Sequence, residues 1–260
     1  MQDLKIAIVQ TDQFWENKQA NFDHLEQHHF SKIKPGSCDL LLLPEMFNTG
    51  FSMAAEQLAE EMTGESIKWL QKWAEILDCQ IGGSLIIKDS NCFYNRFIIV
   101  SKYGLEAFYD KRHLFRMAHE NDTYTPGSDR VVYALKGWKI LLQVCYDLRF
   151  PVFSRNKTIG DRPEYDLVIY VANWPERRAE IWSILLQARA IENQAYCIGL
   201  NRIGTDGKGH SYSGDSAVID PWGQREFLAT KNEELSKIVN LSYSKLTAIR
   251  EEFPAFRDAD

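Results

Sequence analysis

Cysteine is scarce in this sequence and is not arranged for cross-linking. The five cysteines are odd in number, and none forms a Cys-x-x-Cys pair: Cys38, Cys79, Cys92, Cys145 and Cys197. A small secreted domain held by disulfides needs paired and regularly spaced cysteines, so this pattern excludes that class. We therefore expect a reducing compartment, the cytoplasm.

Long apolar runs and an excess of basic residues are also absent. No stretch approaches the roughly 20 apolar residues of a membrane-spanning helix. The N-terminal apolar run is too short for a signal peptide. The formal net charge of −6 argues against a nucleic-acid-binding face, which would be basic. We therefore expect neither a membrane nor a nucleic acid as a partner.

Apolar strands and helical segments fill the chain without a linker or a repeat. Hydrophobic residues make up 45% of 260 residues, which is enough for one large core, so we expect a single domain over residues 1–260. Strand–helix–strand units mix with hairpins, which favours two sheets packed face to face with helices outside, an α/β fold. The polar tail from about residue 245 carries Phe253 and Phe256, so we expect it to pack on this subunit or on a partner.

Glu45, Lys111 and Cys145 each stand directly after an apolar segment that we predict to be a strand. The three strands are expected at residues 40–43, 105–109 and 139–144, and Asn173 follows a fourth at 167–171. In layered α/β proteins, sites are built where the carboxyl ends of strands meet. An acid, an amine and a thiol arriving at that edge indicate a catalytic set.

The thiol of Cys145 needs chemical assistance, because a free cysteine with a pKa near 8.5 is only a few per cent thiolate at neutral pH. Phe150 and Pro151 predict a helix start nearby, and a strand-to-helix turn would expose the sulfur. A carboxylate could take the thiol proton, and an ammonium could stabilise charge on the attacked oxygen. Each of these residue types alone is most often structural or solvated, so the interpretation depends on the combination.

A metal site receives little support from the sequence. His24 and His28 stand four residues apart on a helix expected near residues 17–30, with His29 beside them. This segment is polar on all sides and offers no third ligand, which favours a solvated helix face. Phosphate-binding glycine motifs are absent as well. We expect no metal and no cofactor.

Three segments in their order along the chain resemble the nitrilase superfamily of carbon–nitrogen hydrolases. They match its glutamate, lysine and cysteine motifs: residues 41–47, 109–115 and 143–151. The resemblance implies a four-layer α-β-β-α sandwich that pairs into homodimers. Within the superfamily the chain is most similar to omega-amidases, which release ammonia from 2-oxoglutaramate and 2-oxosuccinamate. The supporting segments are residues 170–178, 186–194 and 253–260.

The resemblance also assigns residue roles. Cys145 would attack the amide carbon and form a thioester, Glu45 would move protons, and Lys111 with the backbone N–H of Tyr146 would hold the oxyanion. Glu120 lies in a polar run that by itself suggests a surface position, but its offset from the Pro126-Gly127 turn matches the family's second glutamate.

The resemblance to omega-amidases implies a substrate with one carboxylate, and binding it calls for a cationic side chain. Arg149 stands where related carbamoylases grip a carboxylate, although it could instead pair with Asp147. Phe47, Asn173 and Trp174 adjoin the motifs and are expected in the pocket. The same triad also serves N-carbamoyl amino acid amidohydrolases and nitrilases. A non-catalytic binding protein on this fold is the alternative from another class.

Overall fold

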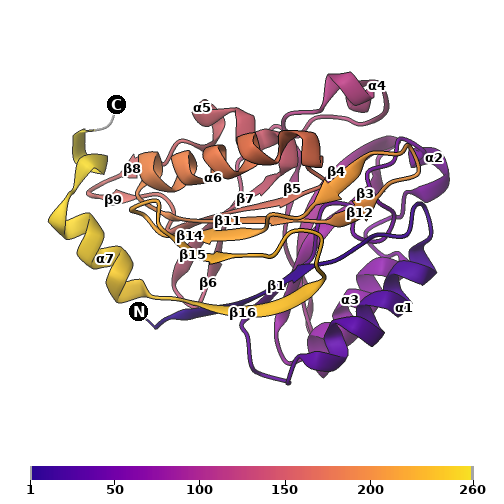
Figure 1. The fold of residues 1–260 in the computed structure, drawn as a ribbon, viewed down its shortest axis with the longest axis horizontal. Coiled ribbons are helices and arrows are strands. Elements are labelled where there is room, and N and C mark those ends of the chain that lie inside the picture. Colours follow the sequence, from indigo (N-terminus) through magenta and orange to yellow (C-terminus); the bar gives the residue numbers. More distant parts are fainter. Residues whose placement is uncertain (1, 259–260) are drawn as a thin grey trace.

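The computed structural model describes residues 2–258 and contains two six-stranded mixed sheets (Figure 1). The first sheet has the order β16-β1-β2-β3-β4-β5. Its strands are β1 (Leu4–Gln10), β2 (Leu40–Leu42), β3 (Gln80–Asp89), β4 (Cys92–Ser101), β5 (Gly104–Asp110) and β16 (Leu235–Leu241). Strands β1, β2 and β3 run parallel to one another, and the other neighbouring pairs in this sheet are antiparallel.

The second sheet has the order β15-β14-β11-β10-β7-β6. Its strands are β6 (Val132–Leu135), β7 (Trp138–Val144), β10 (Leu167–Ala172), β11 (Tyr196–Asn201), β14 (Ala217–Ile219) and β15 (Arg225–Leu228). Here β7, β10 and β11 form the parallel centre. Two short hairpins pair β8 (Thr158–Ile159) with β9 (Arg162–Pro163), and β12 (Ile203–Thr205) with β13 (Ser211–Ser213).

The alternation of side chains along β1 explains why the sheets stack. Ile6 and Ile8 point into a core shared with the second sheet, whereas Ala7 and Val9 point into a second core under helices. The helices over that outer face are α1 (Lys18–His28) and α3 (Glu65–Ile76). Figure 1 shows them on the opposite side of the molecule from α6 (Ala179–Asn193).

Helix α6 covers the outer face of the second sheet. It approaches β11 so closely that a Cβ on Gly199 would lie 2.3 Å from a methyl carbon of Leu186, so only glycine fits there. Short helices at the loops are α2 (Ala55–Leu58), α4 (Glu120–Thr123) and α5 (Pro151–Ser154). The predicted α-β-β-α sandwich is confirmed.

The C-terminal segment forms α7 (Tyr243–Glu252) and a turn at Ala255–Asp258. The side chain of Gln194, just after α6, donates to the carbonyl of Phe253 at 2.6 Å and accepts from the N–H of Phe256 at 2.9 Å. The described part of the tail therefore packs on its own chain, and residues 259–260 lie outside the described residues. Within residues 2–258, no helix has the length and apolar character needed to cross a bilayer.

Candidate active site

Glu45, Lys111 and Cys145 meet between the two sheets, as their positions after strands predict. Glu45 follows β2, Lys111 follows β5 and Cys145 follows β7. All three are buried, with 8% exposure at Cys145 and 1% or less at the other two. Because water is largely excluded from this position, the charges of Glu45 and Lys111 interact more strongly than they would at the surface.

Lys111 is held between two carboxylates. Its ammonium donates to Oε1 of Glu45 at 2.9 Å and to both carboxylate oxygens of Glu120 at 2.9 Å. The N–H of Phe115 also donates to Glu120, at 2.6 Å. Glu120 begins α4 and is fully buried, so the surface position that its polar neighbours suggest is wrong. Its charge is tolerated there because Lys111 and a backbone N–H satisfy it.

Glu45 receives hydrogen bonds at both carboxylate oxygens. Oε1 accepts from Asn95 at 2.7 Å as well as from Lys111, and Oε2 accepts from the backbone N–H of Asn173 at 2.7 Å. The carbonyl of Asn173 faces the sulfur of Cys145 at 3.8 Å. This one residue of the loop after β10 therefore contacts both the acid and the thiol.

Cys145 occupies a strained turn between β7 and α5. It has a φ of +45°, which a non-glycine residue rarely adopts, and it opens a 3-10 turn at Cys145–Arg149. The carboxylate of Asp147 secures this turn, because it accepts from the N–H of Val144 at 3.0 Å, the hydroxyl of Tyr109 at 2.8 Å and the N–H of His113 at 2.9 Å. The turn carries the sulfur to the cavity wall.

Burial and neighbouring charges determine the protonation states of Lys111, Glu120 and Cys145. Burial opposes the ammonium form of Lys111, but the carboxylates of Glu120 and Glu45 outweigh it and raise the pKa of Lys111. Burial raises the pKa of Glu120, and the charge of Lys111 acts in the opposite direction. Burial, followed by the charge of Glu45, raises the pKa of the Cys145 thiol well above its usual value. The resting thiol is protonated at neutral pH, so its attack requires a base.

A cavity of about 300 Å³ opens beside Cys145. Its wall is rich in cations, and the guanidinium groups of Arg149 and Arg178 lie over the rings of Trp174 and Phe115 at 5.2 Å each. Within residues 2–258, no carboxylate is in ion-pair range of Arg149, Arg177 or Arg178. These unpaired cations at a largely apolar cavity suit a small anionic molecule.

The sequence profile of the carbon–nitrogen hydrolase family matches residues 5–251. This chain belongs to the carbon–nitrogen hydrolases. It is 45% identical to the omega-amidase YafV of Yersinia enterocolitica, over 100% of this chain and 98% of that protein. It is 33% identical to a 2-oxoglutaramate amidase of Bacillus subtilis, over 97% and 96% of the two chains.

Solved structures agree with the family assignment. XC1258 from Xanthomonas campestris, a CN-hydrolase superfamily protein solved with an arsenic adduct in the active site, superposes with a TM-score of 0.95 and is 40% identical, over 100% of this chain and 98% of that one. Nit3 of Saccharomyces cerevisiae, a nitrilase superfamily member, gives a TM-score of 0.81 at 24% identity, over 97% and 95% of the chains, a likeness of fold. The chain is a hydrolase acting on carbon–nitrogen bonds.

In this carbon–nitrogen hydrolase, four of the five residues predicted to bind substrate or oxyanion line the cavity: Tyr146, Arg149, Asn173 and Trp174. Phe47 does not line it. Its ring packs 6.1 Å from that of Trp69 in the core under α3, and Phe51 supplies an aromatic wall beside Lys111 instead. Leu41, Leu43 and Phe47 all pack in the core under the helices, so Phe47 continues the face that the odd-numbered residues of this segment already occupy.

Three residues of the site were not assigned a role from the sequence: Asn95, Asp147 and Arg178. Asn95 lies in the middle of β4 and bonds Glu45, and nothing in a strand pattern distinguishes it from a solvated position. Asp147 is not the partner of Arg149, because its carboxylate accepts from the hydroxyl of Tyr109 and the backbone N–H of Val144, whereas Arg149 lies over the ring of Trp174. Arg178 could have been suspected from the double arginine in the segment after Trp174.

Proposed function

We propose that this hydrolase cleaves the terminal amide of 2-oxoglutaramate and 2-oxosuccinamate, producing ammonia and the 2-oxo acid. The names of the relatives from Yersinia enterocolitica and Bacillus subtilis support this substrate class. The observation that carries the proposal is that three arginines without an ion-pair partner among the described residues line the same cavity as the buried thiol of Cys145. A monoamide of a 2-oxo diacid has one carboxylate for the arginines and one amide for Cys145.

Arg149 is the proposed anchor for the substrate carboxylate. Its stacking on Trp174 holds the guanidinium plane at the cavity wall, and a planar fork suits bidentate carboxylate binding. Arg178 lines the same cavity and could contribute. Burial, followed by the charges of Arg177 and Arg149, lowers its pKa. An anion between these cations would relieve their mutual repulsion. Trp174 and Asn173 would complete the walls around the chain of the substrate.

The first half of the reaction forms a thioester. Glu45 accepts the proton of Cys145 as the sulfur attacks the amide carbon, and the carbonyl oxygen becomes an oxyanion. Lys111 and the backbone N–H of Tyr146 stabilise that oxyanion. One N–H of Lys111 can serve both oxygens of Glu120, which leaves another for the substrate. Glu45 returns the proton to the leaving nitrogen, and ammonia departs as the carbon–nitrogen bond breaks.

The second half regenerates the thiol. Water enters the site, Glu45 removes its proton, and the resulting hydroxide attacks the thioester carbonyl at the same oxyanion position. The carbon–sulfur bond breaks, the 2-oxo acid leaves, and Glu45 returns the proton to Cys145. The role of Glu120 in both halves is to hold Lys111 in place, since both of its carboxylate oxygens accept from the ammonium.

The test is ammonia release from 2-oxoglutaramate by the wild type beside Cys145→Ala, with L-glutamine as the control substrate. Release that requires Cys145 and is absent with glutamine supports both the reaction and the need for a 2-oxo acid. Acid quenching followed by intact-mass measurement would detect the acyl thioester as an adduct that Cys145→Ala lacks. A folded wild type without release would reject this substrate class.

The two alternative enzymatic activities would use the same catalytic residues. N-carbamoyl amino acids and nitriles also offer an electrophilic carbon to Cys145, so a panel of both is the comparison for kcat/KM. A non-catalytic binding protein on this fold would bind these compounds without turning any of them over. The buried charges of Glu45, Lys111 and Glu120 argue against a non-catalytic binding protein. Removing three charged groups from water costs free energy, and binding a small molecule does not require all three of them.

We also propose that the chain works as a homodimer. Ile184 and Ile191, seven residues apart on α6, are 56% and 52% exposed and lie on one face of the helix. Val152 on the neighbouring α5 is exposed too. An apolar stripe that a monomer leaves in water is typical of an interface.

A further inference from the structure

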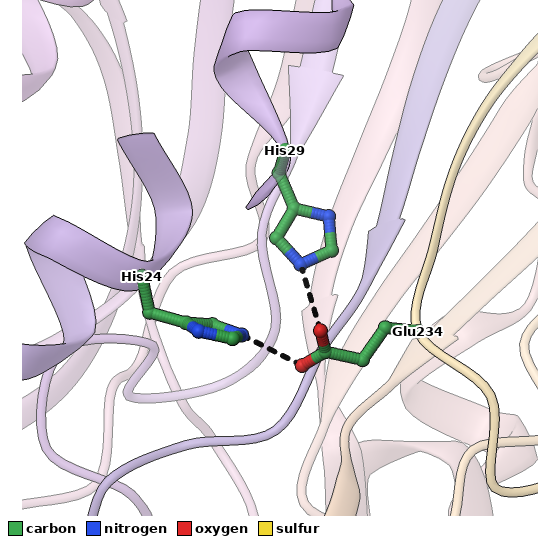
Figure 2. A group of neighbouring side chains, drawn as sticks. All are labelled: His24, His29 and Glu234. Carbon is green, nitrogen blue, oxygen red and sulfur yellow. Dashed lines mark hydrogen bonds and ion pairs between the residues drawn. The ribbon is translucent and has the colours of Figure 1, made fainter. Parts of the chain in front are cut away.

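Two histidines and a glutamate from opposite ends of the chain meet beside the end of α1 (Figure 2). His24 lies on α1, His29 directly follows it, and Glu234 immediately precedes β16. One ligand atom from each side chain lies within 4.8 Å of the other two. None of the three lines the cavity beside Cys145, so the cluster is separate from the candidate active site.

His29 contributes a nitrogen without a partner. The side chain is 2% exposed, and Nδ1 lies 2.8 Å from the hydroxyl of Ser236, whereas Nε2 is buried and has no hydrogen bond. A hydrogen on Nδ1 satisfies Ser236 and leaves a lone pair on Nε2. That lone pair faces Oε2 of Glu234 at 3.9 Å, as Figure 2 shows. A buried polar atom without a partner is costly and calls for a ligand.

Hydrogen bonds hold the carboxylate of Glu234 in position beside the two histidines. Its Oε1 accepts from the N–H of Asp12 at 3.0 Å, the hydroxyl of Thr11 at 3.2 Å and Nε2 of His24 at 2.7 Å. All the hydrogen bonds found for this carboxylate within residues 2–258 fall on Oε1, which leaves Oε2 turned toward His29. The two imidazole nitrogens thus lie against the two oxygens of one carboxylate, and Glu234 remains partly exposed to solvent.

We propose that His24, His29 and Glu234 bind a divalent first-row transition ion of the Zn²⁺ class, with water as the fourth ligand. Imidazole and carboxylate are the donors that such ions select. The sequence favoured a solvated helix face over a metal pair of His24 and His28. The structure instead buries His29 and supplies the third ligand from a residue more than two hundred positions away.

The geometry fits after a small adjustment. A tetrahedral Zn²⁺ with bonds of about 2.0–2.1 Å keeps its ligand atoms roughly 3.4 Å apart, so ligand atoms that now lie within 4.8 Å of one another need to close by at most about 1.4 Å. His24 would give up its hydrogen bond to Glu234 and carry its proton on Nδ1. The bound ion would tie the end of α1 to the start of β16, the edge strand that pairs with β1. Its expected role is structural.

The test is calorimetric titration of metal-free, untagged protein with Zn²⁺. A Cys145→Ala background removes the catalytic thiol as a competing ligand. We expect one ion per chain, and at least a tenfold weaker affinity in Glu234→Gln and in His24→Gln, since even outer-shell changes at metal sites cost about 10–100-fold. Glu233→Gln removes the same charge from the same exposed loop outside the cluster and should leave the affinity unchanged.

Thermal unfolding provides a second readout, because an ion that binds only the folded chain raises Tm. Zn²⁺ should raise Tm in the Cys145→Ala background and in its Glu233→Gln derivative, but much less in the Glu234→Gln derivative. Circular dichroism without metal confirms that each variant is folded. Equal affinity and equal Tm shifts in the Glu233 and Glu234 variants, or no stoichiometric binding, would overturn the proposal.

Discussion

At the scale of single residues, Lys111 links the two acids to the position of the developing oxyanion. Lys111→Met keeps most of the volume but removes the ammonium, and losing one oxyanion donor costs about 10²–10³ in turnover. We expect a kcat loss of that order on 2-oxoglutaramate, measured by ammonia release, with circular dichroism as the control for folding. Turnover close to that of the wild type would remove Lys111 from the mechanism.

The thiol of Cys145 should respond to its charged neighbours in opposite directions. The charge of Glu45 raises the thiol pKa and the charge of Lys111 lowers it, both against a background raised by burial. Glu45→Gln should therefore shift the pH profile of iodoacetamide alkylation at Cys145 toward lower pH, and Lys111→Met toward higher pH. Peptide mass spectrometry separates Cys145 from the other four cysteines. Shifts of the same sign in both variants would contradict this electrostatic account.

Arg149 should distinguish anionic from neutral substrates. A hydrogen bond to a charged group contributes about 1.5–3 kcal/mol, so Arg149→Met should raise KM for 2-oxoglutaramate by roughly 10- to 100-fold. The KM for a short neutral amide should change little. Arg116→Met, at an exposed position outside the cavity wall, serves as the matched control. An equal loss on both substrates would show that Arg149 is structural.

At the scale of elements, the turn between β7 and α5 depends on Asp147. An asparagine offers one acceptor oxygen and turns an amino group toward donors, so Asp147→Asn leaves buried donors of the turn unpaired. We expect a loss of about 1–3 kcal/mol in the free energy of unfolding and a fall in kcat, because the strained Cys145 backbone loses its support.

Urea denaturation measures the stability of this variant, and Asp161→Asn on the exposed β8–β9 loop is the matched control. The free energy of unfolding of the control should be unchanged. Unchanged stability and kcat in Asp147→Asn would show that the turn holds without the carboxylate.

At the scale of the whole molecule, the exposed face of α6 tests the homodimer. Sedimentation velocity should give about twice the chain mass of 30.1 kDa. Ile184→Glu places a charge in the apolar stripe and should shift the species toward the monomer. Ile76→Glu, at a comparably exposed isoleucine on α3, should leave it unchanged. A wild type that sediments as a monomer at micromolar concentration would contradict the dimer.

Strand ends were predictable because apolar runs are local in the sequence, and Glu45, Lys111 and Cys145 stand directly after them. The burial of Glu120 was not predictable from its polar neighbours. It follows from the position of Lys111 at the end of β5, whose ammonium neutralises the carboxylate. Phe47 was placed in the pocket because it adjoins Glu45, but its side chain packs in the same core as Leu41 and Leu43, on the face of the first sheet that the helices cover.

The sequence by itself determined the family, the two-sheet α/β fold and the three residues at the strand ends, because motifs and the alternation of apolar residues lie within a few positions of one another. The tertiary structure decided the rest. It placed Asn95 and Asn173 on Glu45, left Arg149 and Arg178 without carboxylates at the cavity, and brought Glu234 to His24 and His29. These arrangements depend on contacts between distant segments, which form only when the sheets stack and the helices close over them.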